Sequence, residues 1–240
     1  MASSLAAPGL AYGKAVIAFT SFEEPAFVMG AYTDPDTSDH QLSNLSGQPI
    51  VEYIAGTNAP GVELGFTSFF SGNLSTGLSD GDFIGVKQGS INLDEPYPDG
   101  TQGYRFQDTD GTLTMTLDAV DLTPFSADPT LELSFFYYVS ATGWEGPDGL
   151  RIWVEVDGGQ EINLVNPDDV DDLTEGTFIE VTQSLTGFTT ATFNAQLTSS
   201  APAEEMWVDL IRFTVIPEPS ALVLSAVGLG LLATRRRPLD

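Results

Sequence analysis

The chain has 240 residues, of which 34 are acidic and 8 basic, with one histidine and no cysteine. A net charge of −26 repels nucleic acid and anionic lipid and favours divalent cations, so we expect no nucleic-acid partner. The absence of cysteine excludes disulfides and thiol chemistry, and a single histidine leaves few options for zinc or for a histidine base.

Residues 1–14 do not form a complete secretory signal. Such a signal has a positive start and an apolar stretch of roughly 7–15 residues. Here no basic residue precedes Lys14, and Pro8 and Gly9 interrupt the apolar residues. The segment is either the remnant of a signal peptide that begins upstream or an ordinary disordered terminus.

Residues 15–216 are predicted to form one β domain, since their length suits a single sandwich. Runs of β-branched and aromatic residues, bounded by Gly, Asp, Asn or Pro, predict about twelve strands. In chain order these lie at 15–22, 50–53, 62–70, 82–87, 103–106, 112–120, 130–139, 150–156, 161–165, 177–185, 188–197 and 205–216. This spacing predicts an all-β fold, an antiparallel sandwich of the jelly-roll kind rather than a parallel sheet.

The opening and the closing strand together resemble galactose-binding-like jelly rolls, the fold of many carbohydrate-binding modules. The domain opens with Phe22-Glu23 and closes with a strand that carries Asp209 among aliphatic residues. In that family the opening Glu and the closing Asp share a structural calcium, because the first and last strands are neighbours. The resemblance therefore implies Glu23 and Asp209 as metal ligands and calcium as a structural cofactor.

The closing strand gives a second argument for the cation. Strict alternation would place Trp207, Asp209 and Phe213 on one face of the strand. If that face points inward, Asp209 needs hydrogen bonds or a cation, because a buried carboxylate is otherwise costly. Calcium suits it, since several oxygen ligands satisfy this ion. An exposed or backbone-bonded Asp209 is the alternative.

An acidic segment near the N-terminus contains the only histidine. Asp34, Asp36 and Asp39 precede His40 within seven residues. The carboxylates lack the twelve-residue spacing, ending in Glu, of an EF-hand calcium loop. We interpret this segment as a solvated turn.

Trp144 is the aromatic residue that we expect to bind a ligand. Its setting, Thr142-Gly143-Trp144-Glu145-Gly146, predicts a loop between two strands. There an indole presents a flat apolar face to a sugar ring, and Glu145 accepts hydrogen bonds from sugar hydroxyls. The alternative is that Trp144 packs in the core.

Enzymatic activity receives little support from the motifs. The segment from Glu155 to Glu161 superficially resembles the Glu-x-Asp-x-x-Glu strand of laminarinase-like glycosidases. That chemistry needs the carboxylates on one continuous strand, about 5–5.5 Å apart. Here Asp157-Gly158-Gly159 predicts a hairpin turn that puts the two glutamates on different strands. A secreted polysaccharide hydrolase with paired carboxylates stays as the alternative function.

The last 24 residues resemble the PEP-CTERM sorting signal that exosortase recognises in bacteria with an outer membrane. Pro217-Glu218-Pro219 matches the signature, 220–234 the hydrophobic helix, and Arg235, Arg236 and Arg237 the basic end. As a helix, 220–234 would span about 22 Å, which suits a transient rather than a permanent anchor. The resemblance implies export, a membrane-tethered intermediate, cleavage near the motif and release to the cell surface or matrix.

These features together predict a non-enzymatic protein of the cell surface or extracellular matrix. Without Glu218, Asp240 and the three terminal arginines, residues 1–216 keep 32 acidic and five basic residues, a net charge near −27. That charge disfavours acidic polysaccharides. We therefore expect a neutral extracellular polysaccharide as the ligand, with exosortase and the inner membrane as partners during sorting.

Overall fold

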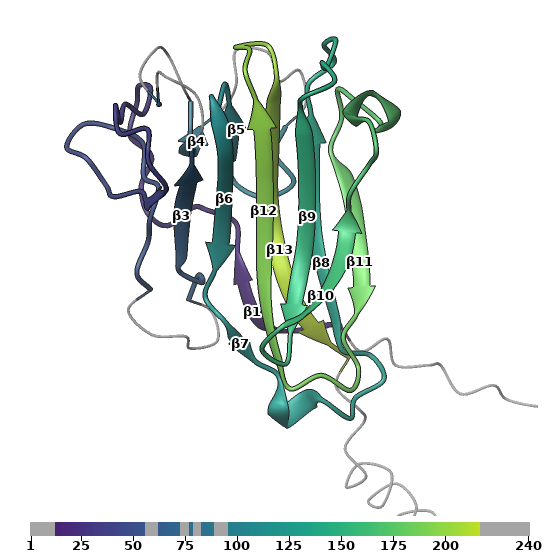
Figure 1. Cartoon of the computed structure of the whole chain (residues 1–240). Coiled ribbons are helices and arrows are strands. Elements are labelled where there is room, and N and C mark those ends of the chain that lie inside the picture. The colour runs from purple at the N-terminus through teal and green to yellow at the C-terminus, as the bar shows by residue number, and fades with distance from the viewer. Residues whose placement is uncertain (1–12, 56–61, 73–76, 79–82, 89–95, 217–240) are drawn as a thin grey trace, which may run out of the picture.

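The computed structural model describes residues 13–55, 62–72, 77–78, 83–88 and 96–216. Within these ranges two antiparallel sheets pack face to face (Figure 1), so the predicted antiparallel β-sandwich is confirmed. The sorting signal at 217–240, with its hydrophobic helix, lies outside the described residues, as do residues 1–12. No helix in the described ranges is long and apolar enough to cross a membrane.

The first sheet has six strands and forms the rear layer in Figure 1. In spatial order its path contains β11 (Ile179–Ser184), β8 (Glu132–Val139), β13 (Glu205–Val215), β5 (Gln102–Gln107) and β4 (Gly85–Gln88). β1 (Ala15–Thr20) also pairs with β13. The first and last strands of the domain are therefore neighbours, as the jelly-roll resemblance implies.

The second sheet has seven strands and faces the viewer in Figure 1. Its path contains β10 (Gln160–Val165), β9 (Gly149–Val156), β12 (Thr190–Ser199), β6 (Gly111–Leu117), β3 (Phe66–Ser71) and β2 (His40–Gln41). β7 (Val120–Asp121) pairs with β12. Two 3₁₀ turns, η1 (Thr123–Phe125) and η2 (Val170–Asp172), lie in the connections.

Most predicted strands are present, and one is wrong. Segment 50–53 forms no strand, because it contributes only isolated bridges from Ile50 to Val86 and from Tyr53 to Phe66. The two-residue strands β2 and β7 were not predicted, since two residues carry no periodicity.

The core lies between the sheets and follows the alternation of each strand. In β6, Leu113 and Met115 are fully buried, whereas Thr112 and Thr114 are half-buried on the outer face. Phe193 of β12 and Phe135 of β8 meet across the core with ring centroids 5.0 Å apart.

A β-bulge in β13 overturns the strict alternation expected there. The pairing with β8 shifts between Asp209 and Arg212, and Leu210 has a φ of +48°. Before the bulge Val208 belongs to the core, and after it Phe213 does. Asp209 therefore does not share a face with Phe213. It lies with Trp207 on the outer face of the six-stranded sheet.

Candidate functional site

Glu23 and Asp209 both bind one short loop, 96–101, which folds over the outer face of the six-stranded sheet. The Glu23 Oε1 atom accepts hydrogen bonds from the backbone N–H groups of Thr101 and Gln102, each at 2.7 Å. Asp209 Oδ2 accepts from the N–H of Asp99 at 3.3 Å. A Cβ at Gly100 would collide with the Glu23 carboxylate. The two predicted metal ligands thus converge on the same backbone segment.

Asp209 is a buried carboxylate in a negative environment. It is fully buried, and besides Asp99 its hydrogen-bond donor is the N–H of Leu210, at 2.6 Å. Burial raises the pKa of Asp209 to about 8. The charges of Asp99 and Glu23 act in the same direction, whereas the two backbone hydrogen bonds act to lower the pKa. A divalent cation would reverse this balance, because it favours the ionised carboxylate.

The segment that presents Glu23 is held by a second buried acid, Glu63. Its carboxylate accepts hydrogen bonds from the hydroxyls of Thr20 and Ser21 at 3.1 and 3.0 Å. It also accepts from the backbone N–H groups of Glu23 and Glu24, each at 3.2 Å. Glu63 is a positioning residue for Glu23, and sequence analysis did not single it out.

The prediction that Trp144 is an exposed sugar-binding ring is wrong. The side chain is 6 % exposed and belongs to the hydrophobic core. Its Nε1–H donates to the Ser140 carbonyl at 3.2 Å, so even the polar edge of the indole has an internal partner. The loop setting was predicted correctly, but the loop folds inward because a large apolar ring gains more from burial than from solvent exposure.

Glu145, predicted together with Trp144, is exposed and belongs to an acidic cluster. Carboxylate oxygens of Glu145, Asp148 and Glu204 all lie within 4.8 Å of one another, so this group could hold a metal ion. Glu204 is buried and accepts hydrogen bonds from the N–H groups of Ser200 and Ala201. Burial, with the charges of Asp148 and Glu145, raises the pKa of Glu204.

A pocket of about 280 Å³ adjoins this acidic cluster at the end of the seven-stranded sheet. Its lining consists of Gly111, Thr112, Pro147, Asp148, Thr198, Ser199 and Ser200. The Thr112 and Thr198 hydroxyls are hydrogen-bonded to each other at 2.8 Å. Hydroxyl groups and one carboxylate therefore dominate the polar chemistry of the pocket.

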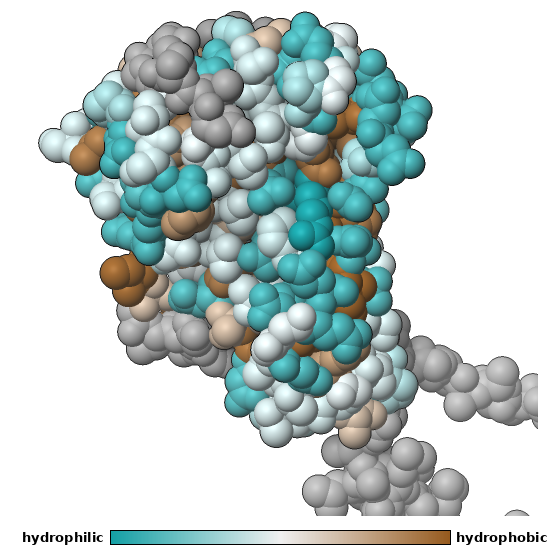
Figure 2. Space-filling view, viewed as in Figure 1, coloured by the Kyte–Doolittle hydropathy of each residue, from teal (hydrophilic) through white to brown (hydrophobic). Residues whose placement is uncertain are grey.

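The outer face of the seven-stranded sheet is open and polar. Figure 2 views this face and shows pale and hydrophilic residues over β6, β12 and β9. One cross-strand row runs through Phe69, Thr114, Gln196 and Arg151, which pair in that order on β3, β6, β12 and β9. Phe69 is 45 % exposed, and the Gln196 amide donates to the Thr114 hydroxyl at 2.9 Å. Three strand spacings separate the ends of the row by about 14 Å.

Arg151 is held rigidly at the end of this row. Its guanidinium bonds to Asn163 Oδ1 through Nε and Nη2, at 2.9 and 2.7 Å, and to Glu161 through Nη2 at 2.5 Å. The guanidinium carbon lies 4.3 Å from the centroid of the Trp153 ring. Within the part of the chain that the structure describes, the hydrogen bonds of this guanidinium involve Nε and Nη2, so Nη1 can donate to a ligand.

The structure confirms that Glu155 and Glu161 lie on different strands. They face each other across the β9–β10 hairpin, with Glu155 near the end of β9 and Glu161 near the start of β10. The continuous carboxylate strand of laminarinase-like enzymes is therefore absent from this hairpin.

Comparisons with known proteins concern the fold. No protein-family model matches the chain, and no curated protein does. A complex of TmCBM61 with β-1,4-galactotriose matches at 14 % identity and a TM-score of 0.36, over 53 % of this chain and 80 % of that one. The family 30 carbohydrate-binding module of a Clostridium thermocellum cellulosomal cellulase matches at 13 % and 0.33, over 76 % and 99 %. The likeness to these β-sandwich modules is distant.

Sequence analysis missed the row on the open face and two members of the acidic cluster. The outward alternation of Thr112, Thr114 and Thr116 was visible, but the register that aligns Thr114 with Gln196 and Arg151 was not. Asp148 and Glu204 lie far apart in the sequence, and only the fold brings them together.

Proposed function

We propose that this protein is a non-enzymatic surface or matrix protein that binds a neutral polysaccharide on the open face of the seven-stranded sheet. The row of Phe69, Thr114, Gln196 and Arg151 is the observation that carries this proposal. An exposed ring stacks on the apolar face of a sugar, while hydroxyl, amide and guanidinium groups bond to its hydroxyls. The row is long enough for a short stretch of an oligosaccharide chain.

The charge of the domain favours an uncharged ligand. Residues 1–216 carry a net charge near −27, counting 32 acidic and five basic residues. A uronate-rich polymer would meet this field as a like charge. The pocket lined by Asp148 extends the polar surface at the end of the same sheet, and Glu145, whose carboxylate lies close to that of Asp148, can accept hydrogen bonds from sugar hydroxyls.

We also propose a structural calcium between Glu23 and Asp209. Support comes from their convergence on loop 96–101 and from the burial of Asp209 among other carboxylates. Calcium that binds only the folded state raises the melting temperature by mass action. Asp209→Ala should abolish most of that rise, whereas a full calcium response in this variant would end the assignment.

We further propose that the protein is exported and sorted through its C-terminal segment. Pro217-Glu218-Pro219, the apolar run and Arg235–Arg237 support exosortase processing at the inner membrane, followed by release. Intact-mass analysis of the surface fraction should show a species that ends near Pro217–Pro219. Recovery of only the full-length chain would overturn the processing step.

Binding is tested by affinity electrophoresis and calorimetry on neutral polysaccharides, with a polyuronate as the charged comparison. Xylan, cellulose and β-1,4-galactan are suitable first probes. Phe69→Ala and Gln196→Ala should each weaken binding about tenfold or more, while Thr182→Ala on the other sheet should not change it. Equal affinity in all three variants would place the site elsewhere, and no affinity for any neutral polymer would overturn carbohydrate binding.

A reducing-sugar assay on the same polymers tests the non-enzymatic part. We expect no release of reducing ends by the wild-type protein. Release that Glu155→Gln or Glu161→Gln abolishes would instead support a hydrolase with paired carboxylates.

A further inference from the structure

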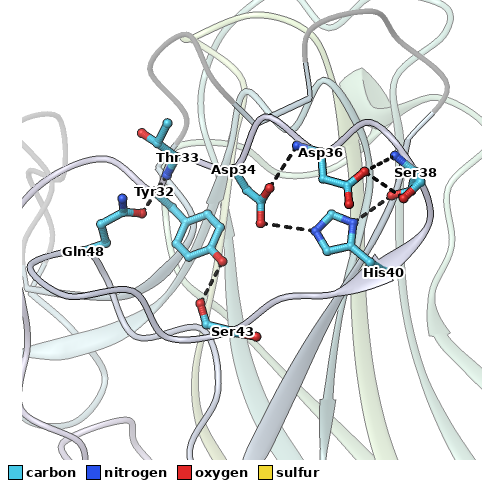
Figure 3. A network of polar contacts seen from close by, with 8 residues as sticks. All are labelled: Tyr32, Thr33, Asp34, Asp36, Ser38, His40, Ser43 and Gln48. Carbon is cyan, nitrogen blue, oxygen red and sulfur yellow. Dashed lines mark hydrogen bonds and ion pairs between the residues drawn. The ribbon is translucent and has the colours of Figure 1, made fainter.

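The only histidine of the chain closes a tight acidic turn at the edge of the seven-stranded sheet. His40, the first residue of β2, places Nε2 3.3 Å from Asp34 Oδ2 and Nδ1 2.7 Å from the Ser38 carbonyl oxygen (Figure 3). On its other side the ring packs edge-on against Phe70 of β3, with centroids 5.9 Å apart. The imidazole thus links the start of the turn to its end.

The chemistry of the two partners decides which form of the ring fits. A carbonyl oxygen and a carboxylate oxygen only accept hydrogen bonds. A neutral imidazole has one N–H donor and one lone pair, whereas the imidazolium has two donors. Only the protonated ring therefore satisfies Asp34 and Ser38 together.

The rest of the turn is built around the same carboxylates. Asp34 Oδ1 accepts from the N–H of Asp36 at 2.9 Å, and Asp36 Oδ1 accepts from the N–H and the hydroxyl of Ser38 at 2.9 and 2.7 Å. Asp34 also donates its backbone N–H to the Leu78 carbonyl at 2.6 Å. The His40 contact with Asp34 therefore belongs to one continuous set of hydrogen bonds that runs from Asp34 through Asp36 to Ser38.

We propose that residues 34–40 form a pH-dependent clasp, in which the His40 imidazolium donates hydrogen bonds to Asp34 and to the Ser38 carbonyl. The clasp is stronger in acid and loosens when the ring loses its proton. The clasp secures β2, whose two residues pair with Phe69 and Phe70 of β3. When it loosens, the backbone edge of β3 loses its cover, and the turn becomes accessible to solvent exchange.

The direction of the pH dependence follows from the groups around the ring. Partial burial lowers the pKa of His40, but the Ser38 carbonyl and the charges of Asp34 and Asp36 outweigh it and raise the pKa. Among the described residues of β3, the uncharged Phe70 packs against the ring. A histidine with a raised folded pKa stabilises the native state below its unfolded pKa, and this stabilisation is lost as the pH rises through the folded value.

The single histidine makes the test direct, because one imidazole signal in the proton NMR spectrum of the whole chain reports its titration. We expect a pKa above the unperturbed value of about 6.5, and a lower pKa in Asp34→Asn. Hydrogen-exchange protection of 34–41 should fall roughly two- to fivefold between about pH 5 and about pH 8, the size expected of a partly exposed ion pair. His40→Gln should remove this pH dependence.

Asp39→Asn is the matched control, since Asp39 bonds to the Ser71 hydroxyl and not to the imidazole. It should leave the His40 titration unchanged. An imidazole pKa at or below the unperturbed value would overturn the clasp. So would the same pH-dependent protection in wild type and His40→Gln.

Discussion

The outer faces of the two sheets carry the same three side chains in opposite settings. On the six-stranded sheet Arg105 Nη2 lies 2.5 Å from Glu205, with the guanidinium 5.3 Å from the Trp207 ring. On the seven-stranded sheet Arg151 Nη2 lies 2.5 Å from Glu161, with the guanidinium 4.3 Å from Trp153. The exposed fractions of the paired side chains are 7 % and 2 % in the first case, but 28 % and 48 % in the second.

A cover over one face makes the difference. Tyr97, from the loop that Glu23 and Asp209 hold, packs against Trp207 with centroids 5.5 Å apart, and Phe83 stacks under the Arg105 guanidinium. Among the residues that the structure describes, no such loop packs over the central row of the open face. The same kind of ion pair is therefore buried on one sheet and exposed to solvent on the other.

The largest expected effect concerns Asp209 beneath the cover. Its pKa is raised from 3.8 to about 8, so the folded state retains a proton that the unfolded chain releases. The free energy of unfolding of the cation-free protein should fall as the pH rises from about 4 to about 8, by at most of the order of 5 kcal/mol. Urea unfolding across this range measures it.

Two comparisons isolate Asp209 as the cause. Asp209→Asn should remove most of the pH-dependent loss, while the exposed Asp168→Asn should retain it. Calcium should also reduce the loss in the wild type, because the cation favours the ionised carboxylate. Identical pH profiles of Asp209→Asn and wild type would contradict the assignment.

The two ion pairs should differ strongly when one partner is neutralised. Glu205→Gln leaves the buried Arg105 charge without its carboxylate and should cost about 3–5 kcal/mol. Glu161→Gln breaks a pair that water screens and should cost less than about 1 kcal/mol. Urea unfolding of both variants tests the comparison, and equal costs would show that the cover does not separate the two environments.

The affinity for a polysaccharide should depend on the exposed arginine, Arg151, and not on the basic residues of the covered sheet. Arg151→Met keeps much of the aliphatic stem but removes the donors at the end of the open row, so binding of a neutral polysaccharide should weaken about tenfold, or about 1.4 kcal/mol. Calorimetry measures the change. Lys87→Met, on the covered sheet, is the control and should bind normally. Unchanged affinity of Arg151→Met would remove this residue from the proposed site.

The smallest expected effect is on the open face itself. Phe69→Ser should change the free energy of unfolding by about 0.5 kcal/mol or less, because the ring is 45 % exposed and packs on one side only. The neighbouring Phe70 is fully buried, and Phe70→Ala should cost about 3–5 kcal/mol. Thermal unfolding of both variants tests whether the stability cost differs as the burial of the two neighbouring side chains predicts.

Alternation and turn residues were sufficient to predict the sandwich and most of its strands, because burial of one face imposes a period of two. They failed at Asp209, where a bulge with Leu210 at positive φ reverses the alternation. The local sequence does not predict a positive φ at Leu210, since leucine rarely adopts this conformation. The placement of Trp144 failed for another reason: loop context predicts position along the chain but not which way a ring turns.

The partners of the candidate site were beyond local patterns altogether. Glu23 and Asp209 could be paired only through the resemblance, because 185 residues separate them along the chain. The open row depends on the register of β3, β6, β12 and β9, no two of which are consecutive in the chain. Side-chain type predicts what a face could bind, whereas strand order determines which side chains meet.

The pairing of β1 with β13 has a mechanical consequence. Ala15 at the start of β1 lies opposite Val215 at the end of β13, so both ends of the sandwich leave from the same pole (Figure 1). A force that pulls these two ends apart acts first on the pairing of Ala15 with Val215. The hydrogen bonds between β1 and β13 then break one pair after another, instead of all being sheared at once. If the domain were attached to other structures by both ends, β1 would separate from β13 at low force. If it were attached by one end alone, no tension would act across the pairing of β1 with β13.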